Sequence, residues 1–264
     1  MATETGLRKA IEHNEFELSY QPQFECDSGK LIGFEALLRW RHPELGLLFP
    51  DAFIGIAEET GLIVPIGAWV LQTACAQAQA WRQHSVQPRL IAVNLSARQF
   101  QHPGLVQQVK SALHDSGLPA NCLELEITES ILMKEIDVSV KVMHELAELG
   151  VQFSIDDFGT GYSSLAYLKK MPIQSLKIDK SFIRDIVTSA DDAAIVNAIL
   201  AMSNQLGLRV VAEGIEEKEQ LAYLINCGGI VGQGYFLGRP VTAQVMTSLM
   251  QKETSERASD LLLV

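Results

Sequence analysis

Eight polar side chains stand at or just beyond short apolar segments that are spread along the whole chain. Any one of them could be a solvated strand end or a helix N-cap, but so many on apolar segments favour a site. The carboxyl ends of barrel strands form the face on which α/β barrels build active sites. We therefore expect the following groups to converge: Glu35, Asn94, Glu126, Asp156 with Asp157, Lys177, Glu213 and Gln233.

Five of these eight groups are carboxylates, which would repel one another strongly in one pocket. Divalent cations remove that conflict, and oxygen ligands without a motif His or Cys favour Mg²⁺ or Mn²⁺ over Zn²⁺. Adjacent aspartates such as Asp156 and Asp157 can engage two ions about 3.5–4 Å apart, the arrangement used for in-line displacement at phosphorus. Phosphoester hydrolysis is the leading chemistry, and action on sugars or carbon acids stays open.

The elements that must position these groups are short apolar runs separated by stretches of helical period. Apolar residues share one stripe in 136–149 and in 193–206, and Gly117, Gly150 and Gly207 follow periodic segments as C′ glycines do. The expected strands are Phe16–Phe24, Leu31–Leu38, Leu90–Leu95, Cys122–Thr128, Val151–Ile155, Ser175–Ile178, Leu208–Ala212 and Gly229–Val231.

Eight strands alternating with helices predict an α/β protein, a (β/α)8 TIM-like barrel, with an open doubly wound sheet as the alternative. The first two strands depart from this alternation. The connection between Phe24 and Leu31, which contains CDSGK, is too short for a helical crossover. We therefore expect an antiparallel first strand.

The composition excludes several classes of protein. The 264 residues carry 32 acidic and 21 basic side chains, a net charge of −11, which disfavours binding to DNA or RNA. Four scattered cysteines and the lack of an apolar N-terminal run favour a reducing, cytoplasmic setting. The uncharged stretch Thr60–Trp81 contains too many polar groups for a lipid-facing span and is interpreted as a loop followed by a core helix.

Seven ordered blocks resemble the EAL family of cyclic-di-GMP phosphodiesterases. They are GFEALLRW (33–40), VNLS (93–96), ELEITES (124–130), DDFGTGYSSL (156–165), SLKIDKSF (175–182), VVAEGIE (210–216) and GQGYFLGRP (232–240). The resemblance implies one EAL phosphodiesterase domain over 1–264, with a core of about 5–250 and a C-terminal tail at 251–264. It also implies the reversed first strand, and Mg²⁺- or Mn²⁺-dependent cleavage of cyclic di-GMP to linear pGpG.

The same resemblance implies roles for individual residues. Glu35, Asn94, Glu126 and Asp156 are similar to the ligands of one metal ion, and Asp156, Asp157 and Glu213 to those of a second. Lys177 stands where the family has a lysine that contacts the attacking water, and we expect its pKa to fall beside two cations. Ca²⁺ is expected to inhibit, because its looser coordination positions the water poorly.

Further positions match contacts to the substrate. They are Gln21, Arg39, Glu216, Gln233 and Phe236, the last because Leu237 stands where many members have a stacking aromatic. Glu129 resembles a glutamate that anchors the loop 157–164, and its parity on strand 124–128 points it away from the metals. Gln23, where Ile or Val is common, has no interpretation at this level.

The family further implies a homodimer formed near the DDFGTGYSS loop, no membrane contact by this chain, and a sensory or GGDEF-type domain in a longer bacterial parent protein. Two other functions stay open. One is a catalytically silent receptor for cyclic di-GMP, although such receptors usually lack a metal ligand, the lysine or the anchoring glutamate. The other is an unrelated metal barrel that acts on another substrate.

Overall fold

Eight strands close into a barrel in the computed structural model, which describes residues 3–84, 89–132, 136–160 and 168–251. The first strand, β1, pairs antiparallel with both neighbours, β2 and β9, and the other barrel strands pair parallel. The predicted (β/α)8 barrel with a reversed first strand is therefore confirmed, and the open-sheet alternative is wrong. The barrel strands are β1 (Phe16–Glu25), β2 (Leu31–His42), β4 (Leu90–Asn94), β5 (Leu123–Thr128), β6 (Gln152–Phe158), β7 (Ser175–Ile178), β8 (Arg209–Ala212) and β9 (Ile230–Gly232).

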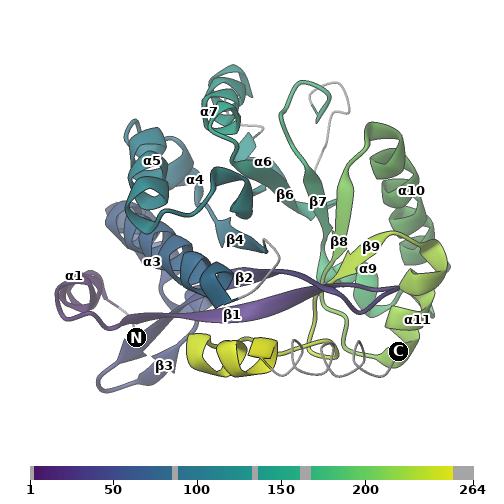
Figure 1. The fold of residues 1–264 in the computed structure, drawn as a ribbon, viewed down its shortest axis with the longest axis horizontal. Coiled ribbons are helices and arrows are strands. Elements are labelled where there is room, and N and C mark those ends of the chain that lie inside the picture. Colours follow the sequence, from purple (N-terminus) through teal and green to yellow (C-terminus); the bar gives the residue numbers. More distant parts are fainter. Residues whose placement is uncertain (1–2, 85–88, 133–135, 161–167, 252–264) are drawn as a thin grey trace.

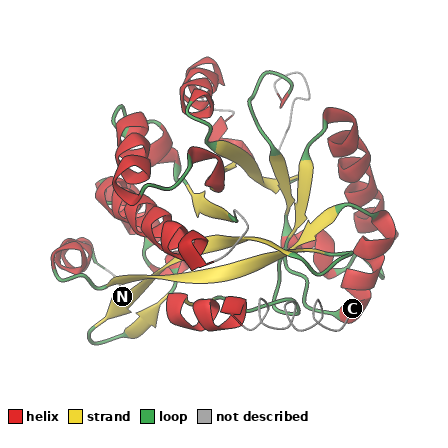
Figure 2. Ribbon diagram, in the orientation of Figure 1, coloured by secondary structure: helices red, strands yellow, loops and turns green. Residues whose placement is uncertain are grey.

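Helices cover the outside of the barrel (Figures 1 and 2). The α-helices are α1 (Glu4–Glu12), α2 (Ile54–Thr60), α3 (Ile63–His84), α4 (Ala97–Phe100), α5 (Leu105–Ser116), α6 (Glu129–Leu132), α7 (Ile136–Glu148), α9 (Lys180–Arg184), α10 (Ala190–Leu206) and α11 (Lys218–Cys227). Two 3₁₀ turns, η1 (Pro50–Ala52) and η2 (Ala120–Cys122), complete the connections, and residues 243–251 form a last helical segment beside β1.

The helix ends follow the local signals of the sequence. Gly117 and Gly207 end α5 and α10 with φ of +68° and +69°, a conformation that glycine adopts without steric cost. Ser189 begins α10, and its side chain accepts a hydrogen bond from the Asp192 amide.

Two strands were not predicted. β3 (Gly46–Leu48) pairs with the end of β2, and β10 (Val241–Thr242) pairs with Ser19 and Tyr20 of β1. β2 itself runs to His42 instead of Leu38. Such short strands form because a longer neighbouring strand offers backbone N–H and C=O groups for pairing. The pattern of their own residues therefore does not predict them.

A single apolar core lies between the barrel wall and the helices. The ring of Trp81 on α3 packs against Tyr20 and Phe34, each with centroids 4.8 Å away, and its Nε1 donates to Thr247 in the last helical segment. Thus the stretch Thr60–Trp81 does contain a core helix. Within the described residues no single helix is long and apolar enough to cross a membrane, and the bent pair 54–60 and 63–83 passes that test by length and composition only.

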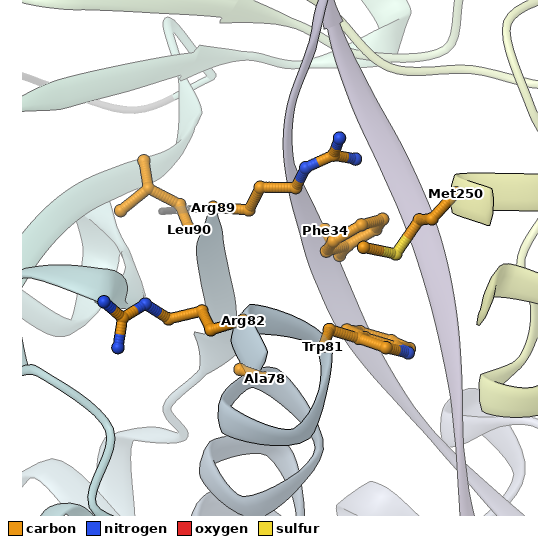
Figure 3. A pocket seen from close by; sticks show the side chains of 7 residues that line it. All are labelled: Phe34, Ala78, Trp81, Arg82, Arg89, Leu90 and Met250. Carbon is orange, nitrogen blue, oxygen red and sulfur yellow. The ribbon is translucent and has the colours of Figure 1, made fainter. Parts of the chain in front are cut away.

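A small cavity lies at the amino end of β4, away from the carboxyl ends of the parallel strands. Phe34, Trp81 and Met250 line one side of it and Arg89 and Leu90 the other (Figure 3). Its volume of about 10 Å³ suffices for one water molecule at most. It is therefore a packing defect of the core and has no connection with the polar groups at the other end of the barrel.

Two glycines in neighbouring helices give a test of this packing. A Cβ at Gly67 in α3 would collide with the amide of Gln99, which caps α4 by accepting from the Ser96 amide at 3.3 Å, whereas a Cβ at Gly55 in α2 meets nothing within 4 Å. We expect Gly67→Ala to lower the unfolding free energy by about 1 kcal/mol, because the lost cap outweighs the gain in helix propensity. The matched variant Gly55→Ala should raise it by up to about 1 kcal/mol in urea titrations. Stabilisation by both changes would contradict a tight α3–α4 contact.

Candidate active site

The interior face of the barrel carries polar side chains on several neighbouring strands. Strand side chains alternate, so Glu124 and Glu126 on β5 share the face that looks into the barrel. The register places Glu126 opposite Asn94 of β4, and Lys177 of β7 opposite Val211 of β8. The extended β2 puts Glu35 in mid-strand, at the height of Ala92.

Lys177 lies at the centre of the carboxylates. Its Nζ is 2.7 Å from Oε2 of Glu126 and 2.6 Å from Oε1 of Glu213, and 3.5 Å from the nearest oxygens of Glu35 and Asp156. The side chain is 1% exposed. Asp179, two residues further along the chain, caps α9 by accepting a hydrogen bond from the Ser181 amide.

An irregularity in β6 turns two adjacent aspartates towards the same place. Neighbouring strand residues normally point to opposite faces, but the β6–β7 register shifts between Ile155 and Phe158, and Asp157 has a φ of +54°. As a result, carboxylate oxygens of Asp156, Asp157 and Glu213 all lie within 4.8 Å of one another. The left-handed backbone at a non-glycine residue is strained, and such strain is concentrated at functional sites.

A chain of amides holds the carboxylate of Glu35. Asn94 Nδ2 donates to one oxygen at 2.6 Å, and Gln233 Nε2 donates to the other at 2.5 Å. Gln233 Nε2 also donates to Gln21 Oε1, whose own Nε2 donates to the Gly238 carbonyl. Because a carboxylate and a carbonyl can only accept, the two ends of this chain fix the orientation of every amide between them.

Gln23 is the site residue that sequence reasoning missed. Its side chain is 2% exposed, and its Nε2 donates to Gln233 Oε1 at 2.9 Å, which leaves the amino group of Gln233 facing Glu35. The signal was present, since Gln21 and Gln23 are two residues apart and share the interior face of β1.

Five carboxylates around one ammonium leave unbalanced negative charge, and the pKa values shift accordingly. Burial, together with the neighbouring Glu35 and Asp156, holds the pKa of Glu126 well above its ordinary value. Burial and the same neighbours raise the pKa of Glu213 to about 7, and burial and Asp156 raise the pKa of Asp157.

Two groups at the centre remain charged. Burial opposes ionisation of Glu35, but the Lys177 ammonium and the amides of Gln233 and Asn94 hold the pKa of Glu35 below its usual range. Burial likewise opposes the charge on Lys177, but the surrounding carboxylates outweigh it and hold the pKa of Lys177 well above its ordinary value. The expected fall in the pKa of Lys177 beside two cations stays a prediction.

The remaining predicted contacts lie at the rim. Arg39 is 6% exposed and lies on the Glu35 face of β2, with its Cζ 4.9 Å from the ring centroid of Phe49. Phe236 is 46% exposed, whereas Leu237 packs against the core. Glu216 is exposed, and within the described residues no ion pair joins it to the cluster.

Glu129 begins α6, directly after the last residue of β5. It is 3% exposed, and neither carboxylate oxygen has a hydrogen-bond partner among the described residues. Residues 161–167 of the loop that it was expected to anchor lie outside the described part of the chain, so that role stays a prediction.

A cavity of about 370 Å³ adjoins the cluster between β2, β4, α2 and α3. Asn94, Leu37 and Thr128 line its inner side, and Pro50 and Ile66 belong to its largely apolar outer side. A polar cluster beside an apolar cavity of this size is typical of a site for a small organic ligand.

The donor set fits divalent cations that prefer oxygen. Oε1 of Glu126 is buried and has no hydrogen-bond partner in the part of the chain that the structure describes, although buried carboxylate oxygens are normally paired. Asp156, Asp157 and Glu213 offer a second group of oxygens close enough to share an ion. No histidine or cysteine takes part in that group, in accord with the expected preference for Mg²⁺ or Mn²⁺.

Fold and site together define a β/α barrel with one reversed strand and an acidic, lysine-centred mouth. The chain belongs to the EAL domain family, whose model matches residues 4–240. It is 49% identical over 238 residues to the bifunctional diguanylate cyclase/cyclic di-GMP phosphodiesterase MucR of Pseudomonas aeruginosa, covering 90% of this chain and 35% of MucR. It is 44% identical to the cyclic di-GMP phosphodiesterase NbdA of the same organism, covering 94% of this chain and 32% of NbdA.

A solved structure supports the same family assignment. The structure described as "PaMucR Phosphodiesterase, c-di-GMP complex" superposes with a TM-score of 0.89 at 48% sequence identity, covering 92% of this chain and 98% of that chain. This chain spans about a third of the length of the curated relatives named above.

The raised pKa of Glu213 predicts how stability depends on pH. Between its ordinary value of 4.5 and about 7 the folded state holds more protons than the unfolded state, so the unfolding free energy falls as pH rises through that window. In EDTA, Glu213→Gln should therefore raise Tm more at pH 8 than at pH 5. The control Glu219→Gln, at an exposed position of α11, should shift Tm equally at both pH values. An equal shift for Glu213→Gln would contradict the charge imbalance.

Proposed function

We propose that this chain hydrolyses one phosphodiester bond of cyclic di-GMP to linear pGpG, at a site that uses two Mg²⁺ or Mn²⁺ ions. The observation that carries the proposal is the convergence of four carboxylates on Lys177 at the carboxyl end of the barrel, with Asp157 beside two of them and Asn94 hydrogen-bonded to a third. Similarity to MucR and NbdA, whose names specify cyclic di-GMP phosphodiesterases, supports the choice of substrate.

The proposed ligands divide into two sets. Glu35, Asn94, Glu126 and Asp156 hold one ion, and Asp156, Asp157 and Glu213 hold the second, so that Asp156 belongs to both. The unpartnered Glu126 oxygen supports the first set and the close oxygens of the other three carboxylates support the second. When bound, such ions lower the pKa of a water and offset the charge that develops on phosphorus.

Lys177 and Glu213 are the proposed proton-handling groups. The ammonium of Lys177, held between Glu126 and Glu213, can orient a water at the mouth by donating to it. The amide chain keeps the carboxylate of Glu35 ionised and aimed inward, which makes Glu35 a catalytic residue as well as a ligand. Preorganised charge of this kind contributes most of the rate enhancement in many enzymes.

Substrate contacts are proposed for the rim. The guanidinium of Arg39 suits a phosphate oxygen or a base edge. The amides of Gln21 and Gln233 are hydrogen-bonded to each other beside Glu35. Glu216 stands where the family has a carboxylate near guanine, and Phe236 precedes the position of the family's stacking aromatic, which is Leu237 here. The apolar cavity beside Asn94 offers room for the less polar part of the ligand.

The cellular context is inferred from the family. We infer a cytoplasmic bacterial enzyme within a longer parent protein that carries a sensory or GGDEF-type domain, and we infer that the domain forms a homodimer. We also propose that Glu129 positions the loop 157–164. Its buried, unpaired carboxylate supports a partner other than the groups of the cluster.

The experiment that tests the function is a product assay on purified protein with cyclic di-GMP. EDTA should abolish formation of pGpG, added Mg²⁺ or Mn²⁺ should restore it, and Ca²⁺ should bind without supporting turnover. Tight binding of cyclic di-GMP without turnover in any metal would make the protein a receptor instead. Full activity in Ca²⁺ alone would overturn the proposed metal site.

Single substitutions at the centre should separate catalysis from folding. Lys177→Ala and Glu35→Ala should each lower kcat by about 10²-fold or more, since each removes part of one preorganised constellation. Lys110→Ala, which breaks an exposed ion pair with Glu145, is the matched control and should keep the kcat of the parent chain. A near-parental kcat for Lys177→Ala would assign the proton-handling role to another group.

A further inference from the structure

Exposed aromatic side chains are concentrated at one end of the molecule. In the described part of the chain, three aromatic residues are exposed: Phe49 at 57%, Tyr235 at 50% and Phe236 at 46%. Phe49 directly precedes Pro50, which lines the cavity beside the carboxylates, and Tyr235 follows Gln233 by two residues. Single exposed apolar residues are ordinary, but their restriction to the mouth of the site is not.

Two of these three rings are each covered on one face by an arginine. The Arg39 Cζ lies 4.9 Å from the Phe49 centroid, and the Arg239 Cζ lies 4.3 Å from the Tyr235 centroid. Arg39 is itself buried, and its Nη1 donates to the Leu38 carbonyl at 2.8 Å. Arg39 is thereby fixed against the Phe49 ring, and each arginine contributes a cation–π interaction, while about half of the surface of Phe49 and of Tyr235 stays open to solvent.

Both ring–arginine pairs border the same opening. Arg39 lies on the face of β2 that carries Glu35, and Glu35 and Tyr235 are both near enough to offset the fall that burial causes in the pKa of Arg39. Two hydrogen bonds tie the segment after β9 to the site, from Gln233 to Glu35 and from Gln21 to the Gly238 carbonyl. The rings therefore flank the carboxylate cluster from two separate connections of the chain.

We propose that Phe49 and Tyr235 are the base-stacking residues of this site, each receiving one purine of a cyclic dinucleotide on its open face. The inference rests on the proposed function and extends it to two residues to which the family resemblance assigned no role. Aromatic rings stack on nucleobases through their π-faces, and the backing arginines preorganise these two for that contact. Leu237 cannot serve, because it packs inward against Gly232 and the core.

Kinetics on two substrates test the proposal. Cyclic di-GMP carries two purines, and bis(p-nitrophenyl) phosphate offers a phosphodiester without them. Phe49→Ala and Tyr235→Ala should each raise KM for cyclic di-GMP by about 5- to 100-fold and lower kcat by a smaller factor. Both alanine variants should change the kinetics on the purine-free ester less. Phe49→Tyr, which keeps an aromatic ring, should retain the parental KM for cyclic di-GMP. The control is Leu45→Ala, at the exposed tip of the β2–β3 hairpin that precedes Phe49. This variant should keep parental kinetics on both substrates.

Three results would overturn the proposal: KM within twofold of the parent for both alanine variants, equal losses on the two substrates, or an increase in KM caused by Phe236→Ala alone. Failure of the proposed function would appear separately, as no turnover of cyclic di-GMP by the parent chain. In that case calorimetric titration with cyclic di-GMP still decides the matter, because the two alanine variants should raise Kd by the same 5- to 100-fold. Unchanged Kd values would refute the stacking role.

Discussion

The gathering of carboxylates at the mouth of the barrel is the constraint on which the other groups there depend. Four carboxylates lie within 3.5 Å of the Lys177 ammonium, and Asp157 adjoins two of these four. Amides stabilise the charge on Glu35, and burial among like charges raises the pKa of Glu213 to about 7. Divalent cations would allow all five carboxylates to be ionised together.

The reversed strand contributes to this balance. Gln21 and Gln23 of β1 supply side chains that carry a dipole but no charge, and they reach the carboxylate of Glu35 through Gln233. A charged residue at either position would have deepened the repulsion or competed with Lys177. Neutral amides fix the geometry of the mouth without changing its net charge, so charge and orientation are controlled by different residues.

The sequence predicted all eight barrel strands and the reversed pairing, because apolar runs, helical periods and a five-residue connection are local signals. It also predicted which polar groups would meet. It could not predict the bulge that lets Asp156 and Asp157 face one point, the hydrogen bond made by Gln23, or the short strands β3 and β10. Each of these features depends on a partner from a distant part of the sequence that the closed barrel brings near. The local residue pattern of the segment therefore does not specify it.

The direction of β1 also determines where the start of the domain lies. Because β1 is antiparallel to β2, its first residues stand beside the last residues of β2, with Phe16 opposite Trp40 and Glu17 opposite Arg39. Trp40 donates to the Glu15 carboxylate at 2.9 Å, and its ring borders Gly6 of α1. A displacement of the N-terminal helix would act on Trp40, which is the residue next to Arg39 in β2. The amino-terminal helix and the rim of the barrel are thus connected through one side chain, that of Trp40.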